Sequence, residues 1–564
     1  MTSVPQVPGA VCFLPRARFT RKTGQPRRRN GDRMTRSLTA LCIALSFLML
    51  AGCKGDPATP EYWESGIQQS RRAEDRIRMV EAMRSSGKMD ERFLPMLHGQ
   101  LGTERKPEVR AALARALGDL KHASSVEPLT KALDPAAGDM PAQLANKAIV
   151  ATLGAIGDRR AIPALVPLLR AKDNYTRIEA VQVLGDMKAK EAVEPLITLA
   201  TDDTVEPFLN KKAIEALGDI GDGRAAPALV RMLTKERKGK SFYVESSFAL
   251  YQLGAPAADA LLQALEGQDA DLLKWARSNG VNPASYAMKA ATVLGDLREK
   301  RAVATLLKQL AFTNTDPQIQ ALVRMQAADA LARMRAQEAV KPLAGLVSET
   351  DATVRDSYVS ALVRLGGRDA LPALEKAAGT GDWYARELAV KGIAMLGDAR
   401  ELPLLQKLAA AEPARTAADC KQAEDEGCDD AAALGKQRAD QIAGQSKLLE
   451  AAQACGGNAG CWVQRMEKAE PRMLERAALE VGRSGAAEHA GALASRLGER
   501  DTEARLALVL AVGWLVEGSQ DVAKKLREAS LPTMRKQLAD EQGNTRFVSV
   551  NEDLRRLVTT LDRP

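Results

Sequence analysis

Apolar and polar positions follow one recurring pattern along most of the chain. In the segment AIEALGDIGDGRAAPALVRML (213–233), apolar residues return every three or four positions, stop at Leu-Gly-Asp and resume beside a proline. Such steps place apolar side chains on one face of a helix, so each copy predicts two helices joined by a short turn. Further copies occupy residues 112–133, 148–169, 180–200, 290–310, 361–378 and 392–410.

Glycine and proline mark the helix ends in these copies. The first four marker glycines are spaced 36, 31 and 33 residues apart: Gly118, Gly154, Gly185 and Gly218. Because glycine lacks a Cβ, we expect each of them to end its helix in the left-handed conformation. The aspartate that often follows should then lie in the turn or act as an N-cap. A proline such as Pro163 should stand in the first turn of the second helix, where a missing N–H is harmless.

Helix pairs of this kind cannot bury their apolar faces alone, so we expect them to stack into a curved array. Their repeated Leu-Gly-Asp and Pro-Leu core resembles HEAT repeats, particularly the short HEAT-like variety of phycobilin lyases. The resemblance covers residues 67–411 and, more loosely, 471–564. It implies an all-α fold, a HEAT-like α-solenoid that forms a right-handed superhelix, with atypical end copies. We expect NEDLRRLVTTL, with Asn551 as its N-cap, to be the last copy.

A different pattern precedes the repeats. Leu38–Leu50 is a run of thirteen almost wholly apolar residues that follows a basic segment. The run is shorter than the ~20 residues of a membrane-spanning helix and is typical of a signal peptide. We therefore expect residues 1–33 to be an over-extended start or a dispensable extension, and residues 34–52 to be the signal. Residues 53–66, rich in proline and glycine, should form a tether.

The end of the apolar run, Leu50-Ala51-Gly52-Cys53, resembles the lipobox of bacterial lipoproteins. The resemblance implies that Cys53 is joined to diacylglycerol and becomes the first residue of the mature chain. Two or more acyl chains anchor a protein stably. Lys54 stands where an aspartate would favour the inner membrane, so we expect a lipid-anchored envelope protein in the outer membrane. Whether it faces the periplasm or the exterior stays open.

The net charge of +8 is confined to the leader. Residues 1–52 contain nine Lys or Arg and a single acid, Asp32, and the chain from Cys53 onward is balanced. A balanced mature chain has no net field to attract phosphate, so we do not expect nucleic acid as a partner.

Residues 412–470 interrupt the repeats and contain four cysteines: Cys420, Cys428, Cys455 and Cys461. An even number of cysteines in an exported chain predicts two disulfides, and their spacing does not match a zinc site. If residues 429–454 form one helix, its ends lie about 39 Å apart, too far to pair Cys428 with Cys455. Pairing within each half, Cys420 with Cys428 and Cys455 with Cys461, is then favoured. A helix break at Gly435 or Gly444 would keep the other pairings open.

The sequence shows no catalytic constellation or metal-spaced histidine pair, so we expect no enzymatic activity, no metal and no cofactor. Aromatic residues are rare in this sequence, and aromatic side chains are over-represented at binding hot spots. Five are therefore candidate partner contacts, with packing between repeats as the alternative: Phe242, Tyr243, Trp275, Trp383 and Tyr384.

These features predict a membrane-anchored HEAT-repeat scaffold that binds one or more envelope proteins. Two alternatives stay open, because a fold does not by itself determine a function. One is a structural protein that binds the cell wall or lipopolysaccharide. The other is a lyase-like enzyme or enzyme subunit, which the resemblance to the chromophore lyases suggests.

Overall fold

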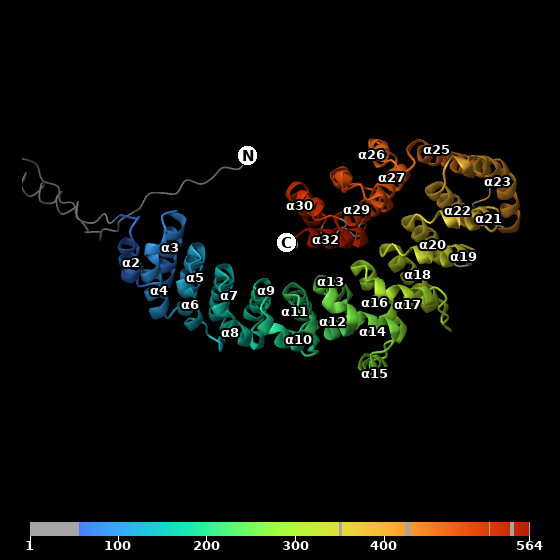
Figure 1. Cartoon of the computed structure of the whole chain (residues 1–564). Helices are drawn as coiled ribbons and strands as arrows, with labels where there is room; N and C mark the ends of the chain where they lie inside the picture. The colour runs from blue at the N-terminus through green and yellow to red at the C-terminus, as the bar shows by residue number, and fades with distance from the viewer. Residues whose placement is uncertain are drawn as a thin grey trace, which may run out of the picture.

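The chain folds into an all-α solenoid of helix pairs stacked along a curved path (Figure 1). This computed structural model describes residues 56–348, 352–423, 428, 430–517, 519–541, 546 and 548–562. The predicted extension, the signal and Cys53 lie outside these residues. The predicted fold class, an all-α repeat solenoid with a cysteine-containing insertion, is confirmed.

Two rows of helices run along the first two thirds of the array. The inner row lines the concave side and contains α3 (Ala73–Ser85), α5 (Pro107–Leu120), α7 (Met140–Ile156), α9 (Asn174–Asp186), α11 (Pro207–Ile220), α13 (Tyr243–Leu253), α16 (Pro283–Leu297), α18 (Pro317–Arg333), α20 (Ala352–Leu365) and α22 (Trp383–Leu396). The outer row contains α4 (Leu94–Thr103), α6 (Val126–Lys131), α8 (Ile162–Leu165), α10 (Val193–Thr201), α12 (Ala226–Met232), α14 (Ala255–Glu266), α17 (Val303–Gln309), α19 (Val340–Gly345) and α21 (Leu371–Ala378). A short hairpin, β1 (Glu236–Arg237) with β2 (Lys240–Ser241), and α15 (Ala270–Ser278) lie between repeats.

The turns between inner and outer helices are capped by a repeated Asp-x-Arg pattern. Asp158 accepts a hydrogen bond from the backbone N–H of Arg160, and the Arg160 guanidinium returns to the same carboxylate. Asp222 and Arg224 repeat this arrangement. The side-chain hydrogen bond from each arginine lowers the pKa of its aspartate to about 2. The outer helices follow, and Pro163 lies in the first turn of α8 as predicted.

The marker glycines play a different role from the one predicted. Gly218 lies inside α11 rather than after it, and a Cβ there would stand 2.8 Å from the Cα of Ala249 on α13. A Cβ on Gly295 of α16 would likewise stand 2.8 Å from the Cα of Ala330 on α18. These glycines therefore allow neighbouring inner helices to pack closely, and the aspartate after each one is still helical.

In five repeats the left-handed residue comes three positions after the marker glycine: Gly157, Gly221, Lys121, Lys188 and Arg298. The prediction that the marker glycine supplies this conformation was therefore wrong for Gly118, Gly154, Gly185 and Gly218, because the helix continues for one or two more residues. It is confirmed for Gly366, which has a positive φ directly after α20.

The predicted tether is partly helical. Helix α2 (Pro60–Gln69) begins inside it, since Trp63 and Ile67 are buried against the first repeat. The indole Nε1 of Trp63 donates a hydrogen bond to the carbonyl of Pro57 over 2.8 Å. The ordered array therefore begins before residue 67.

The insertion consists of two helical hairpins: α23 (Leu402–Ala423) with α24 (Ala431–Gly444), and α25 (Ser446–Cys455) with α26 (Ala459–Met466). The single helix considered for residues 429–454 is broken after Gly444. The favoured pairing is nevertheless present, with disulfides Cys420–Cys428 and Cys455–Cys461. Each bond closes a turn between two helices of the insertion.

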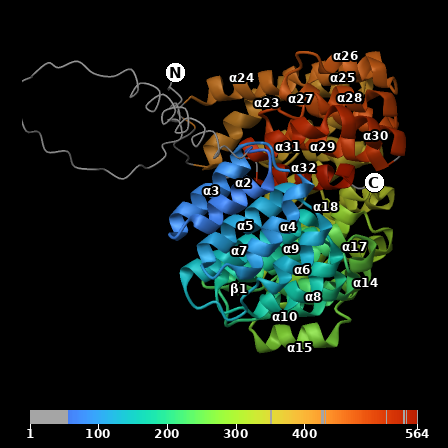
Figure 2. The ribbon, with the colours of Figure 1, turned by 90° about the vertical axis from the view of Figure 1, so that its left-hand side faces the viewer.

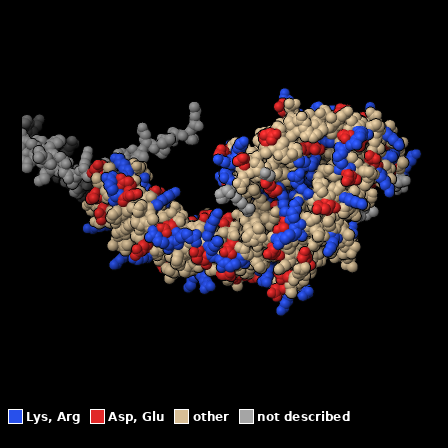
Figure 3. All heavy atoms as spheres, in the orientation of Figure 1, with Lys and Arg blue, Asp and Glu red and all other residues tan. Residues whose placement is uncertain are grey.

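The last helices turn back onto the concave side. They are α27 (Pro471–Ser484), α28 (Ala490–Ala494), α29 (Thr502–Glu517), α30 (Gln520–Ala529), α31 (Leu531–Asp540) and α32 (Val548–Asp562). Figure 2 shows them gathered on one side of the repeat array. We call residues 60–220 (α2–α11) the arm. Figure 3 shows the arm projecting from the compact C-terminal half with its concave side open.

Two further points concern particular helices. Asn551 is not an N-cap, because α32 begins at Val548, and its side chain instead accepts a hydrogen bond of 3.0 Å from Arg505. Within the described residues, no helix combines the length and hydropathy needed to span a bilayer.

Candidate functional site

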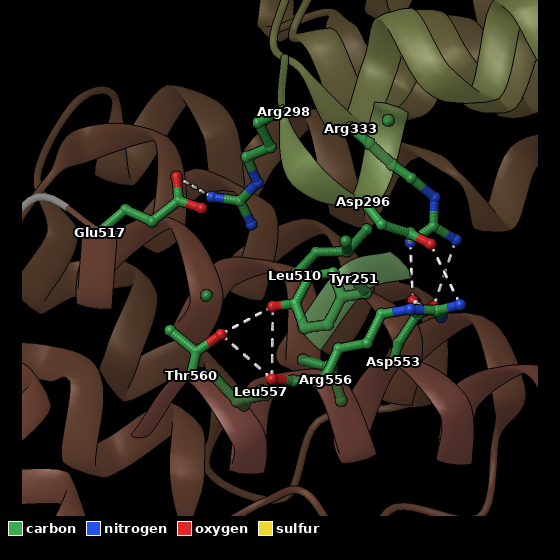
Figure 4. A pocket seen from close by; sticks show the side chains of 13 residues that line it. Tyr251, Asp296, Arg298, Arg333, Leu510, Glu517, Asp553, Arg556, Leu557 and Thr560 are labelled. Atoms are coloured by element: carbon green, nitrogen blue, oxygen red, sulfur yellow. Dashed lines mark hydrogen bonds and ion pairs between the residues drawn. The ribbon is translucent and has the colours of Figure 1, made fainter. Parts of the chain in front are cut away.

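The concave side has a covered part and an open part. In the covered part, α32 crosses three inner helices in turn (Figure 4). Near its start, Asp553 pairs with Arg333 of α18 at 2.7 Å. One turn later Arg556 pairs with Asp296 of α16 at 3.0 Å. Near its end, Thr560 shares a hydrogen bond of 2.7 Å with the hydroxyl of Tyr251 on α13.

These contacts form a buried ionic cluster. Burial raises the pKa of Asp296 to about 6, although Arg556 and Arg333 favour its charged form. Asp329 is also enclosed, but the attraction of Arg333 and Arg364 outweighs its burial and lowers its pKa. The pKa values of two carboxylates of one cluster are therefore shifted in opposite directions. Removing one member of a buried ion pair typically costs about 3–5 kcal/mol, because its partner stays buried and unpaired.

Further contacts on either side of the ionic cluster hold the C-terminal helices against the inner helices. Arg298 pairs with Glu517 of α29, and the guanidinium of Arg335 lies 5.2 Å from the centre of the Trp514 ring. Farther along, Lys391 of α22 pairs with Glu503 of α29 at 2.8 Å. The concave side of α13–α22 is thus occupied by the chain's own C-terminal repeats.

Arg555 marks the border between the two parts. Its guanidinium lies 3.6 Å from the centre of the Phe248 ring on α13. It also faces Glu215 and Asp219 of α11, whose negative charges favour its charged form against the effect of burial. Arg555 of α32 is therefore close enough to α11, the helix at the border of the open part, to be stabilised by its acids.

The open part is the concave side of α3–α11, which we call the open groove. At its N-terminal end it holds a cavity of about 700 Å³ between α3, α5 and α7. Alanines line the floor of this cavity, Leu144 lies on its wall, and Arg84 and Asp119 pair at 2.6 Å on its rim. The surface is therefore apolar at its base and charged at its edge.

One register of the repeat exposes large apolar side chains. Leu144, Tyr175, Phe208 and Val244, which we call the apolar row, each stand ten positions before the glycine of their repeat. They lie on successive inner helices and are 45%, 43%, 56% and 44% exposed. Contiguous exposed apolar surface on a soluble protein commonly marks an interaction site. Sequence analysis missed the row because each member looks like an ordinary apolar position of a helix.

A row of aspartates lies near the C-terminal ends of α5, α9, α11 and α16, and two of these helices, α9 and α11, also carry the apolar row. Asp119, Asp186, Asp219 and Asp296, the acidic row, each follow the repeat glycine. Eleven helical residues separate the two rows on α9 and on α11, or about 17 Å along the axis. Burial raises the pKa of Asp186 and of Asp219, and the charge of Asp186 raises the latter further. In the part of the chain that the structure describes, Asp186 has no ion-pair or hydrogen-bond partner.

The basic side chains beside the open groove already have acidic partners. Five such pairs link the inner helices and their neighbours: Arg84–Asp119, Arg115–Glu81, Lys147–Glu179, Lys211–Glu245 and Lys212–Glu215. Among the described residues of α9 and α11, Asp186 and Asp219 form no ion pair. Arg177 of α9 forms none either, but the charges of Asp202 and Asp173 favour its charged form.

The predicted aromatic contacts occupy different environments. Phe242 is fully buried, so it is a core residue with no surface to offer a partner. Tyr243 is covered by Lys289, whose Nζ lies 5.0 Å from its ring centre, and Trp275 packs edge-on against Tyr286. Trp383 holds the insertion, because Arg438 of α24 lies 4.8 Å from its ring centre.

Tyr384 alone among the five is substantially exposed, at 45%. It lines a cavity of about 380 Å³ between α22, the insertion and α27. It lies far along the chain from the apolar row, so the structure does not bring the five aromatics together. No group of three or more potential metal ligands occurs among the residues described.

Comparison with known proteins identifies the repeat. The profile of HEAT repeats matches residues 94–175, 135–208, 165–241, 282–363 and 345–423, which together cover just over half of the chain. Phycocyanobilin lyase subunit alpha of a Picosynechococcus species is 30% identical over 206 residues, which are 35% of this chain and 66% of the relative. The protein of the same name from a Nostoc species is 29% identical over 167 residues, 27% of this chain and 60% of the relative. The chain spans less than two thirds of the length of each.

Two solved structures are also similar. Kap121p bound to Nup53p has a TM-score of 0.38 and 12% identity, with 93% of this chain and 71% of that chain covered. The complex of CpcE and CpcF of phycocyanin lyase from Nostoc has a TM-score of 0.23 and 21% identity, with 50% and 96% covered. Both scores are below 0.5.

The names of the relatives correct one expectation. The sequence led us to expect no enzymatic activity, because it shows no catalytic constellation. Two relatives at about 30% identity are subunits of a lyase, and this overturns the expectation. HEAT-like repeats can serve an enzyme without supplying a recognisable catalytic motif, which is why the sequence pattern misled.

Proposed function

Because the chain belongs to the HEAT-repeat family, we propose that it is a lipid-anchored scaffold of the bacterial envelope that binds a protein partner in its open groove. The observation that carries this proposal is the apolar row, four exposed apolar side chains on successive inner helices. A solenoid presents such a row as a long, shaped surface that a partner can cover. In the covered part of the concave side, the inner helices α13, α16 and α18 receive another helix, α32.

Anchorage would place the open groove near the bilayer. Seven positions separate Cys53 from Pro60, where α2 begins. A chain of that length spans at most about 25 Å. If Cys53 carries the acyl chains, the start of α2 is held within that distance of the membrane surface. Its partner would then be a protein embedded in, or attached to, the same membrane.

Site-specific crosslinking in living cells tests the scaffold. A photo-reactive residue at Tyr175 or Phe208 should join the chain to a protein of the envelope. The control position is Glu194, an exposed residue of α10 on the outer row. Equal yields at all three positions, or no protein adduct at Tyr175 and Phe208, would reject the open groove as the binding surface.

Metabolic labelling with a radioactive fatty acid tests the anchor separately. The wild-type chain should carry the label and sediment with membranes. A Cys53→Ala variant should lose both properties. Label retained by that variant would rule out Cys53 as the lipidated residue.

A second candidate role follows from the relatives' names. Identity of 30% over 206 residues to phycocyanobilin lyase subunit alpha supports a lyase-like role, in which the chain is one subunit acting on a bilin chromophore. The cavity between α3, α5 and α7 would be the place to hold such a ligand. Incubating the purified chain with phycocyanobilin should then change the visible absorbance spectrum. An unchanged spectrum, with no pigment retained on gel filtration, would reject this role.

A further inference from the structure

We infer that the open groove binds an amphipathic helix whose apolar face is bordered by Arg or Lys, laid end to end with α32. This inference rests on the proposed scaffold function and specifies the chemistry of the partner. It goes beyond the choice of surface, because the chain's own last helix supplies the pattern of contacts.

Helix α32 shows how the inner row accepts a helix. Its residues Asp553, Arg556 and Thr560 meet α18, α16 and α13 in that order. The helix therefore runs across the inner helices, from later to earlier repeats. Its C-terminal end is directed toward α11, and beyond that end no helix of the described residues covers the concave side (Figure 1).

The contacts of Arg555 show which groups surround a cationic side chain on the concave side. Its guanidinium stacks on Phe248, which stands one helical turn after Val244 of the apolar row. It also faces Asp219 of the acidic row. An arginine in this groove thus combines an aromatic or apolar contact with an acid from the neighbouring repeat. Stacking of this kind favours a desolvated cation.

The next repeats offer an aromatic ring and an acid as well, with the ring one helical turn earlier than Phe248, at the position of Val244. Phe208 and Asp219 lie on α11, and Tyr175 and Asp186 lie on α9, with the same spacing in both helices. Residues separated by eleven positions share one helical face, so each pair points into the groove. A helix that continues the path of α32 would meet Phe208 and then Tyr175 on one side. It would meet Asp219 and then Asp186 on the other.

The negative charge of the open groove favours a cationic helix. Lys147, Lys211 and Lys212 beside the groove are already paired, whereas Asp186 has no partner in the described part of the chain. The charge of Asp186 raises the pKa of Asp219, and a cation between the two carboxylates would offset this repulsion. An acidic helix would add to that repulsion, and like charges at an interface cost affinity.

The width of the groove selects a helix. The two rows lie about 17 Å apart along the inner helices, and a helix with its side chains is about 10–12 Å across. A helix of that width fits between the rows and reaches both with its side chains. An extended strand is narrower and would reach only one row at a time.

Two synthetic peptides of eighteen residues provide the probes. Both carry leucine on one face, and the other positions are lysine in one peptide and glutamate in its counterpart. Fluorescence anisotropy with the purified full chain should show that the leucine–lysine peptide binds at least tenfold more tightly. The pair of substitutions Asp186→Asn and Asp219→Asn should weaken that binding at least tenfold, as should Tyr175→Ala combined with Phe208→Ala.

Matched variants keep the test specific. Glu194→Gln removes an exposed acid from the outer row, and Leu322→Ala removes an exposed apolar residue of α18 outside the arm. Neither should change the affinity. All four changed residues in the groove are solvent-exposed, so circular dichroism should show unchanged folding. Equal binding of both peptides, or binding that survives both double substitutions, would overturn the inference.

The scaffold proposal can survive that result. Mass spectrometry of the protein crosslinked at Tyr175 identifies the partner segment that lies in the groove. A segment without a basic amphipathic helix would reject this inference and leave the scaffold intact. A segment from a second copy of this chain would also reject it, whereas a basic amphipathic helix of another envelope protein would support both proposals.

Discussion

Arg556 of α32 and Asp296 of α16 form an ion pair of 3.0 Å in the middle of the covered concave side. The pair joins the last helix of the chain to a repeat near its centre. Both side chains are withdrawn from solvent, and their neighbours Arg333 and Asp553 complete the cluster. This contact turns a one-dimensional array into a structure that closes on itself over half its length.

Replacing Arg556 should release that closure. Arg556→Ala leaves Asp296 and Asp553 buried without one of their counter-ions, so we expect the free energy of unfolding to fall by about 3–5 kcal/mol. Urea unfolding measured by circular dichroism gives the change. Arg535→Ala is the matched control, because Arg535 pairs with Asp562 at the exposed surface of the same region. Surface pairs contribute about 0–1 kcal/mol, and comparable losses in both variants would contradict a special role for the cluster.

The pKa of Asp296 predicts a pH dependence. The folded-state pKa of about 6 lies above the ordinary aspartate pKa of 3.8, so the folded state binds a proton more readily than the unfolded state. The contribution of Asp296 to stability should therefore be greatest below pH 4 and fall as the pH rises to about 6. Its size is on the order of 2–3 kcal/mol.

Comparison with Asp296→Asn isolates this effect. The unfolding free energy of the wild type should decrease relative to that of the variant between pH 4 and pH 6, and the difference should be constant above pH 7. Urea titrations at several pH values provide the measurement. A difference that grows in favour of the wild type as the pH rises would show that the pKa is lowered instead.

The repeat glycines predict an unusual response to alanine. Gly218→Ala would ordinarily stabilise a helix by about 1 kcal/mol. Here the new Cβ would press against Ala249 of α13, so we expect a loss of about 1–3 kcal/mol instead. Gly221→Lys should cost less, since Lys121 and Lys188 adopt the same left-handed conformation in other repeats. Thermal unfolding ranks the two variants, and a more stable Gly218→Ala protein would disprove close packing at this glycine.

The disulfide at the tip of the insertion should stabilise it locally. Cys420–Cys428 closes a loop with a sequence separation of 8 residues. Loop-closure entropy for that length amounts to about 2–3 kcal/mol. Replacing both cysteines by serine should increase hydrogen exchange in α23 and α24, measured by mass spectrometry, and leave α5 and α7 unchanged. Unaltered exchange in α23 and α24 would mean that helix packing alone holds the hairpin.

Much of the fold could be predicted, because each repeat carries its own periodicity and most repeats carry a proline at the start of the second helix. The role of Gly218 could not, since the sequence shows a glycine but not which neighbouring helix approaches it. The packing of α32 on the inner helices could not be predicted either, because Arg333 and Asp553 lie 220 positions apart. No local pattern connects residues at that separation.

The candidate site was harder to predict than the fold. Phe242 and Trp383 were candidate contacts because aromatic residues are rare in this chain. Phe242 is a core residue, and Trp383 anchors the insertion. Tyr175 and Phe208 were passed over because they begin otherwise regular apolar patterns. Their exposure follows from the curvature of the array, which places the first turn of each inner helix at the edge of the concave side.

The closure by α27–α32 also determines how the molecule can deform. An array whose repeats touch only their neighbours bends like a spring along its whole length. Cross-contacts such as Arg335 with Trp514 and Lys391 with Glu503 prevent this in the C-terminal half, which should move as a stiff block. Bending is then concentrated in the arm. Opening and closing around a partner would occur next to the proposed membrane anchor and leave the rest of the molecule unchanged.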